Sequence, residues 1–174
     1  PIGTLLQAAP QETVNFILTF TNKVIEFFSK SELGNEAEEI DVIIDDAGAT
    51  VKQYIGHRIW NIYRGTQTNP PLLESIHMAL ENWLLWLAKT YDAELVEKWC
   101  FYLIKNSRSA STTAIVVSVV LAEPVKLFNV AKILLQNKDF FFFDFSRLHL
   151  DRTSAKFTYS LAHDPGGIFR DELL

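Results

Sequence analysis

Apolar residues recur every three or four positions along most of this chain, and this spacing constrains the fold more than any other feature. Such a period places the apolar side chains on one face of an α-helix. Over residues 10–33, a second apolar stripe accompanies the first and consists of Phe16, Phe20 and Phe27. A helix with two apolar stripes is expected to be covered on both sides. We therefore predict a helix over residues 10–33 that ends at Gly34, is buried on two sides and belongs to a stack of helices.

From residue 71 onward, predicted helices alternate with short turns. Two helix pairs cover residues 71–106 and 110–137, and Asp92 is a suitable N-cap for the second helix of the first pair. Each pair has the length of one repeat of the HEAT or armadillo size class. We predict a mainly α fold with α-solenoid-like helical repeats over residues 57–147 and a tail over residues 148–174. A helical bundle is the alternative, because the two pairs share little sequence.

One stretch departs from the helical period. Ile40, Val42 and Ile44 lie at every second position, which is the period of a β-strand with one buried face. The turn-forming residues from Asp45 to Gly48 follow, and apolar residues return after them. We predict a β-hairpin over residues 39–55. A lone hairpin is marginal in water, so it must pack against the helices.

The valine-rich residues 114–122 fit two structures. Valine favours a strand by propensity. The neighbouring segments are all helical, however, and Glu123 and Pro124 are typical of the start of another helix. We predict a buried helix here and keep a strand as the alternative.

Composition limits the classes of function. The chain is 48% hydrophobic and 21% charged, which is typical of a folded domain. The net charge is -5, and Lys and Arg are dispersed among Asp and Glu, so we expect no nucleic-acid binding. Cys100 is the single cysteine and lies on an apolar helix face, which predicts a buried thiol in a reducing cytoplasm. No apolar run reaches about 18 residues, so we expect no membrane-spanning helix.

The usual motifs of catalysis are absent. The sequence has no P-loop, no G-x-G-x-x-G, no G-x-S-x-G and no H-E-x-x-H. Its four histidines, none with a second histidine three or four residues away, are His57, His77, His149 and His163. We expect His77 on the outer face of its helix, beside Glu74 and Glu81. We predict no catalytic, cofactor-binding or metal-binding residue in this chain.

Two loops support an alternative function as a small ligand-binding domain or enzyme. The hairpin carries Asp41, Asp45 and Asp46, but these lack the ligand order of a calcium loop. The loop from His163 to Gly167 contains two glycines that would let the backbone approach a phosphate. We expect both loops to be plain turns.

The run of four phenylalanines is the most unusual feature of the second half. Successive side chains of a helix turn by about 100°, so four in a row cannot all face one core. The outward ones must pack against a further helix or form a contact surface for a partner. We predict an interaction surface made of Phe140, Phe141, Phe142 and Phe143.

Several stretches resemble helical regions of large bacterial multidomain ATP-binding proteins of the NACHT-like signal-transduction type. These stretches run from Ile59 to Gly65, Pro71 to Ser75, Met78 to Leu84, Glu97 to Trp99 and Leu103 to Ser107. The resemblance covers residues 59–147 and excludes the ATPase signature. It implies a sensor, scaffold or regulatory arm that contacts other domains of the same polypeptide or another protein.

We therefore expect a non-catalytic interaction or scaffold module of a larger intracellular bacterial protein, in which residues 1–174 form a single helical domain or segment. The proline at position 1 and the helix-like residues at the C-terminal end lead us to expect a piece of a longer chain. The expected setting is the cytoplasm, without a membrane or nucleic-acid partner.

Overall fold

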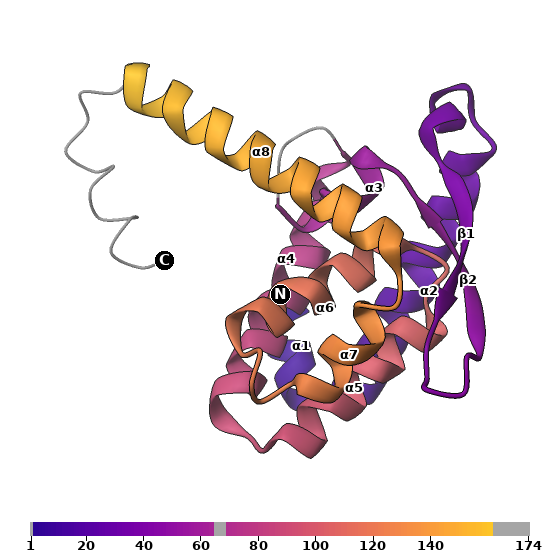
Figure 1. Cartoon of the computed structure of the whole chain (residues 1–174), viewed down its shortest axis with the longest axis vertical. Helices are drawn as coiled ribbons and strands as arrows, with labels where there is room; N and C mark the ends of the chain where they lie inside the picture. The colour runs from indigo at the N-terminus through magenta and orange to yellow at the C-terminus, as the bar shows by residue number, and fades with distance from the viewer. Residues whose placement is uncertain (1, 65–68, 162–174) are drawn as a thin grey trace.

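The computed structural model describes residues 2–64 and 69–161, with side chains described up to residue 152. The described chain is mainly helical and contains one two-stranded antiparallel sheet (Figure 1), which confirms the predicted mainly α fold with a small hairpin. In chain order the elements are α1 (Ile2–Ala8), α2 (Pro10–Ser29), the 3-10 helix η1 (Glu32–Glu36), β1 (Glu38–Ile43), β2 (Thr50–Ile55), α3 (His57–Trp60), the 3-10 helix η2 (Ile62–Arg64), α4 (Pro71–Thr90), α5 (Ala93–Asn106), α6 (Ala110–Ala122), α7 (Phe128–Leu134) and α8 (Lys138–Leu161).

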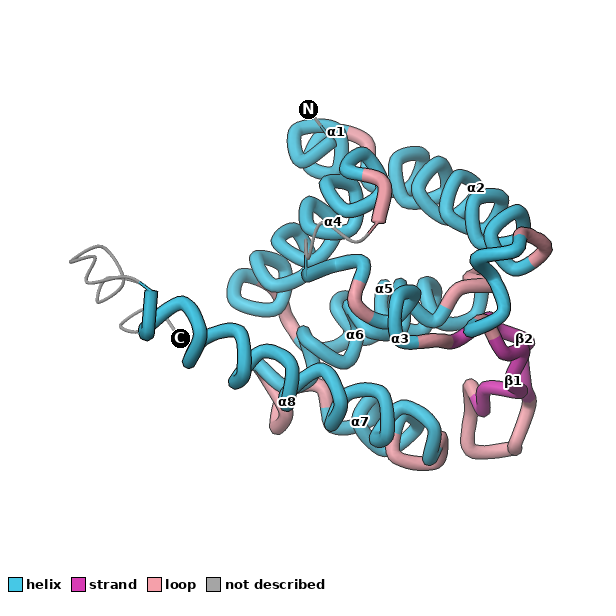
Figure 2. Tube along the Cα trace, turned by 90° about the horizontal axis from the view of Figure 1, so that it is seen from above, coloured by secondary structure: helices cyan, strands magenta, loops and turns pink. Residues whose placement is uncertain are grey.

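Helix α6 is the centre of the fold. It contacts α3, α4, α5, α7, η2 and β2, and it lies between the end formed by α1 and α2 and the end formed by α7 and α8 (Figure 2). Its valine-rich segment is helical, so the predicted helix is confirmed and the strand alternative is wrong. The strand propensity of valine is overridden because small apolar side chains let several elements pack closely around one helix.

Three helix pairs follow one another along the body. The pairs are α1 with α2, α4 with α5, and α6 with α7, and the members of each pair are in contact. Successive pairs also touch, because α4 contacts both α1 and α6, and α5 contacts both α6 and α7. The last two pairs occupy nearly the predicted residue ranges.

The tail predicted over residues 148–174 begins as helix, because α8 continues as one helix to Leu161 and extends away from the body (Figure 1). Arg147 supports this continuation. Its guanidinium pairs with Asp144 one turn before it and with Asp151 one turn after it. Pairs at these spacings stabilise a helix.

Helix α2 ends four residues earlier than predicted. The hydroxyls of Ser29 and Ser31 donate to the backbone carbonyls of Glu26 and Phe28. These side-chain hydrogen bonds compete with the backbone hydrogen bonds that would continue the helix. Gly34 lies beyond the end, in η1, where a Cβ atom would come within 2.1 Å of the Phe28 carbonyl oxygen. Glycine is therefore required where the chain crosses back over the end of α2, and it does not terminate the helix itself.

The prediction that α2 is covered on both sides is wrong for the described chain. One face is buried and includes Val14 and Ile17. On the other face, Phe16 is 55% exposed and Phe27 is 77% exposed. Phe20, the third member of the second stripe, is half-buried and packs against the core, so the open apolar face consists of Phe16 and Phe27.

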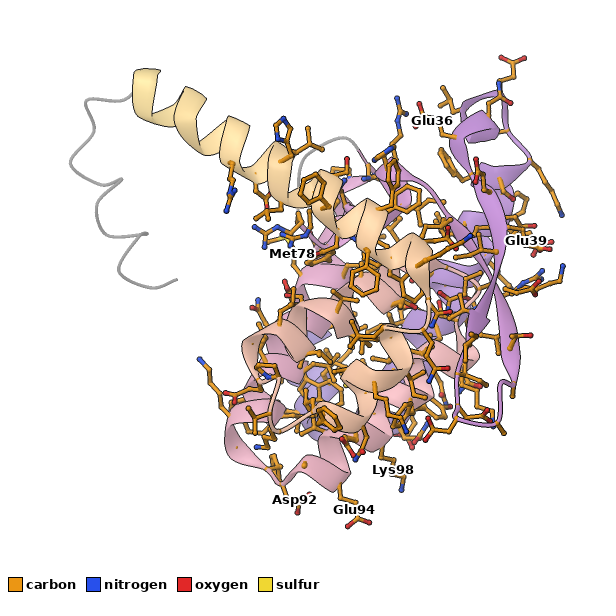
Figure 3. All side chains as sticks on the ribbon, viewed as in Figure 1. Glu36, Glu39, Met78, Asp92, Glu94 and Lys98 are labelled. Atoms are coloured by element: carbon orange, nitrogen blue, oxygen red, sulfur yellow. The ribbon has the colours of Figure 1, made fainter. Side chains whose placement is uncertain are left out.

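The turn between α4 and α5 has the predicted cap. The Asp92 carboxylate accepts a hydrogen bond from the backbone N–H of Leu95 at 3.0 Å. Asp92, Glu94 and Lys98 point away from the body at this turn (Figure 3). The turn also carries Tyr91, which is 43% exposed, so this end presents charged side chains beside an aromatic one.

The hairpin packs against the helices, as a two-stranded sheet must. The two strands pair in a register that runs from Glu38 opposite Ile55 to Ile43 opposite Thr50. Gln53 joins the hairpin to the body, because its amide N–H donates to the Ile104 carbonyl at 2.9 Å and its amide oxygen accepts from Thr113 at 2.8 Å.

Asn137, which directly precedes α8, holds the hairpin in place near its turn. Its side-chain oxygen accepts from the N–H of Ile43 at 2.8 Å, and its amide group donates to the Ile43 carbonyl at 3.1 Å and to the Ile133 carbonyl at 3.0 Å. Asn137 thus replaces a missing strand neighbour at Ile43 and holds the hairpin against the turn between α7 and α8.

Replacing Asn137 with Asp tests this attachment. A carboxylate keeps the acceptor but loses both donations and faces two carbonyl oxygens, so we expect a loss of about 1–3 kcal/mol in the free energy of unfolding. Urea unfolding measures this loss, and hydrogen exchange should show the backbone amides of β1 exchanging faster. Asn82→Asp, at an exposed position of α4, should change neither quantity. Equal stability of the two variants would contradict the assigned role.

Candidate interaction surface

The four phenylalanines divide into two anchors and two outward side chains. Phe140 is buried and stacks on Trp60 with ring centroids 5.4 Å apart, while the half-buried Phe143 lies 5.0 Å from the His57 ring. Phe141 and Phe142 are 52% and 63% exposed. The predicted surface of four residues therefore has Phe141 and Phe142 as its accessible part, because the other two fasten α8 to α3.

Sequence reasoning missed two further members of this surface. Phe145 is 73% exposed and Leu148 is 39% exposed. Together with Phe141 they lie at spacings of four and three residues, which places them on one face of α8. We call these three residues the outer stripe. The signal in the sequence is the helical spacing of apolar residues, which continues past Phe143 to Phe145 and Leu148.

A groove opens beside the outer stripe. Its volume is about 250 Å³, and its lining comes from α6, the loop before α7, α7 itself, the turn after it and α8. The lining residues are Val117, Val120, Leu121, Pro124, Ala131, Leu134, Leu135, Phe140, Phe141 and Asp144. Asp144 is the only polar side chain among them. The volume is below the usual range of about 300–1,000 Å³ for small-molecule sites, so the groove fits apolar side chains better than a whole cofactor.

The rim of the groove is also apolar. Leu121 and Leu135 are 59% and 61% exposed, and on the nearby surface Phe128 and Val125 are exposed as well. Single exposed apolar residues are ordinary, but a continuous group of this kind typically marks a contact surface.

A charged cluster holds α8 in place at one end of the groove. Arg147 donates from Nε to Asp144 at 2.7 Å and from Nη1 to Asp151 at 2.8 Å, and Arg64 of η2 pairs with Asp151 at 3.3 Å. The hydrogen bond from Arg147 to Asp144 raises the pKa of the guanidinium. The Asp144 carboxylate is therefore held in a fixed orientation at the edge of the groove.

His77 is in the core, so the prediction of a surface histidine is wrong. Its Nδ1–H donates to the Leu73 carbonyl at 2.9 Å, and its Nε2 accepts from the Ser111 hydroxyl at 2.8 Å. Ser111 in turn bonds to Ser109 at 2.7 Å. Burial lowers the pKa of His77 to about 4. Ser111 makes this burial tolerable, because its hydroxyl satisfies the second ring nitrogen.

This serine–histidine arrangement is structural. His77, Ser109 and Ser111 are each fully buried, so no substrate reaches them. Cys100 is also buried, and burial raises the pKa of its thiol to about 12, which makes it unreactive as predicted.

The Asp-rich hairpin borders an open cavity of about 350 Å³. Its polar lining side chains are Asp45, Asp46, Asn129 and Lys132, and all four are exposed. Asp45 accepts from the N–H of Ala49, as a turn residue does, and Asp46 pairs with Lys132 at 2.9 Å. An ion pair between exposed side chains of this kind contributes little free energy in water. The loop from His163 to Gly167 lies outside the described residues.

In the described part of the chain, no three His, Cys, Asp or Glu side chains are grouped so that they could hold a metal ion. Among the helices within residues 2–64 and 69–161, none has the length and apolar character to cross a bilayer. No protein-family model and no curated protein matches the chain.

Alanine substitutions at Phe140 and Phe142 test which of the four phenylalanines are buried and which are exposed. Phe140→Ala should lower the free energy of unfolding by about 3–5 kcal/mol, because it empties a buried site against Trp60. Phe142→Ala should change it by less than about 1 kcal/mol, because this side chain is mostly in solvent. Thermal and urea unfolding of both variants provide the measurement. Similar losses would show that the helix is rotated relative to the arrangement described.

The buried histidine makes stability depend on pH. Below pH 6.5 the unfolded chain protonates His77, whereas the folded chain keeps it neutral down to about pH 4. The free energy of unfolding should therefore fall between pH 6.5 and 4, and this residue should contribute about 3 kcal/mol to the fall. Urea unfolding over this range should give a flatter profile for His77→Gln than for the wild type. Parallel profiles would contradict the burial of a neutral imidazole.

Proposed function

We propose that this chain is a non-catalytic interaction module that holds a neighbouring protein segment against α7 and α8. The observation that carries the proposal is the continuous apolar surface formed by the outer stripe and the adjoining groove. An apolar surface of this kind is costly to leave in water, and it is typical of a site that another protein covers. The polar networks of the core support the same conclusion, because their side chains bond to one another and are closed to solvent.

We further propose that the helix pairs form a HEAT- or armadillo-like stack. In such a stack each pair contacts only its neighbours, and the terminal faces stay apolar until another element covers them. The succession of the three pairs supports this, and so do the open apolar faces on α2 and on α7 with α8. The many contacts of α6 suit a helical bundle equally well, so the proposal rests mainly on the two open faces.

As the wider setting, we propose the sensor or regulatory arm of a larger bacterial signalling or defence ATPase in the cytoplasm. The resemblance over residues 59–147 supports this setting. The lone cysteine suits a reducing compartment. The partners would be other domains of the same polypeptide or another protein.

Photo-crosslinking in the native host tests the interaction module. A photoreactive phenylalanine analogue at position 145 or 128, both highly exposed, should form discrete covalent adducts, because these positions face the bound segment. The matched control is position 72 on α4, where Leu72 is 63% exposed but is not among the residues that line the groove. Adduct formation is followed as a mass shift on a gel, and the linked peptide is identified by mass spectrometry. Equal labelling at all three positions, or none at 145 and 128, would refute the proposal.

A further inference from the structure

The hairpin has an open backbone edge on β1. The sheet to which β1 belongs consists of two strands in the described chain, so β1 has a strand neighbour on one side only. We propose that β1 accepts an extended, lysine- or arginine-bearing segment of a partner protein as a third strand. This inference goes beyond the proposed function, because it uses no residue of the outer stripe or of the groove lining.

The backbone groups of β1 point alternately toward β2 and away from it, as in any antiparallel pair. The N–H of Ile44, directly after β1, donates to the Ala49 carbonyl at 2.9 Å, so the even-numbered residues of this segment face β2. The odd-numbered residues Glu39, Asp41 and Ile43 therefore direct their N–H and carbonyl groups toward the open edge.

The fold closes this edge at both ends and leaves a gap between them. Asn137 occupies the backbone groups of Ile43 with hydrogen bonds of 2.8 and 3.1 Å. At the other end, the N–H of Ala37 donates to a carbonyl of η1 at 2.8 Å. Along this edge of the described chain, the exposed Glu39 and Asp41 keep outward backbone groups without a protein partner. Two donors and two acceptors in alternation are what a strand of about five residues pairs with.

The opposite edge of the hairpin is fastened to the body. The N–H of Tyr54 in β2 donates to the Arg108 carbonyl at 2.8 Å, and Gln53 bonds to α5 and α6. The backbone of β1 is therefore already held in the extended form that a partner strand needs, and little ordering accompanies binding. A two-stranded sheet is marginal in water, and a third strand stabilises it.

The side chains of β1 determine the charge of the partner. Glu38, Glu39 and Asp41 are exposed, β1 contains no Lys or Arg, and Glu39 points away from the body (Figure 3). Lys52 is the only cation of the two strands, and its hydrogen bond to Glu39 and the nearby Asp41 carboxylate raise its pKa. One lysine beside three carboxylates leaves this edge negative. Opposite charges on neighbouring strands stabilise their pairing and like charges oppose it, so the edge favours a basic segment.

Backbone methylation of a peptide tests the pairing on the unmodified protein. The probe is a labelled peptide of about seven residues in which lysine alternates with threonine, so all its cations share one face. In an antiparallel strand, the lysines opposite Glu39 and Asp41 direct their N–H groups toward β1. By fluorescence anisotropy, we expect N-methylation of two central lysines to weaken binding at least about tenfold. Methylation of two central threonines should weaken it by about threefold or less.

A glutamate–threonine peptide tests the charge and should bind at least about tenfold more weakly than the lysine–threonine peptide. Equal binding of these two peptides, equal binding of the two methylated peptides, or no binding at about 1 mM lysine–threonine peptide would overturn the proposal.

Two substitutions of Asp41 separate the backbone from the charge. Asp41→Pro removes the outward N–H, and an edge strand tolerates proline where that group faces solvent. Asp41→Asn removes the charge and keeps the N–H. We expect Asp41→Pro to weaken the lysine–threonine peptide at least about tenfold, and Asp41→Asn to weaken it by about threefold or less. Melting temperatures of both variants show whether the fold is retained, and equal affinity of a folded Asp41→Pro variant and the wild type would contradict the pairing.

Hydrogen exchange of the wild type locates the bound peptide. The amides of Glu39 and Asp41 should exchange at least about tenfold more slowly with the lysine–threonine peptide bound, and unchanged exchange of both would refute the assigned edge. A concentration-dependent dimer in analytical ultracentrifugation that Asp41→Pro abolishes would show that a second copy pairs with β1, and it would also refute the proposal. Failure of either kind leaves the crosslinks expected from positions 145 and 128 unaffected, so the two proposals fail separately.

Discussion

The burial of the N-terminal half of α6 depends on hydrogen bonds at its N-terminal end. Ser109, Ser111 and Thr113 are fully buried, and each hydroxyl has a partner: the two serines bond to each other, Ser111 also bonds to His77, and Thr113 bonds to Gln53. A buried hydroxyl without a partner costs about 1–3 kcal/mol, so each of these hydrogen bonds offsets a cost of that size at the centre of the fold. The same bonds connect α4, α6 and the hairpin, so the network fixes the relative positions of three elements that are distant in sequence.

This arrangement gives α6 two different ends. Its N-terminal end is locked by polar bonds, whereas its second half contributes Val117, Val120 and Leu121 to the groove. A lining on a rigid central helix is preorganised, and a preorganised site loses less conformational entropy when it binds. The structure thus combines a polar, closed interior with an apolar, open edge.

Local periodicity was sufficient to predict most of the helices, although not α1, as well as the hairpin and the fact that some of the four phenylalanines face outward. It could not predict which of them do, because that depends on where α8 crosses Trp60, some eighty residues earlier in the chain. The same limit explains the error at His77, whose partner Ser111 lies 34 positions away and turns a polar side chain inward. The groove could not be predicted from local periodicity either, because its lining residues come from separate segments of the chain. The positions of Phe145 and Leu148 on the same helix face could have been predicted, because their spacing from Phe141 continues the helical period.

The exposed apolar residues near α7 are held in place by the fold. Lys126 in the loop between α6 and α7 donates to the carbonyls of Ala88 and Tyr91 and so caps the C-terminal end of α4. Asn129 at the start of α7 bonds to Glu97 of α5. These anchors on both sides of Phe128 prevent the loop and helix from turning their apolar side chains inward. The exposure is therefore a consequence of a fixed backbone, and covering it requires a segment that comes from outside the described fold.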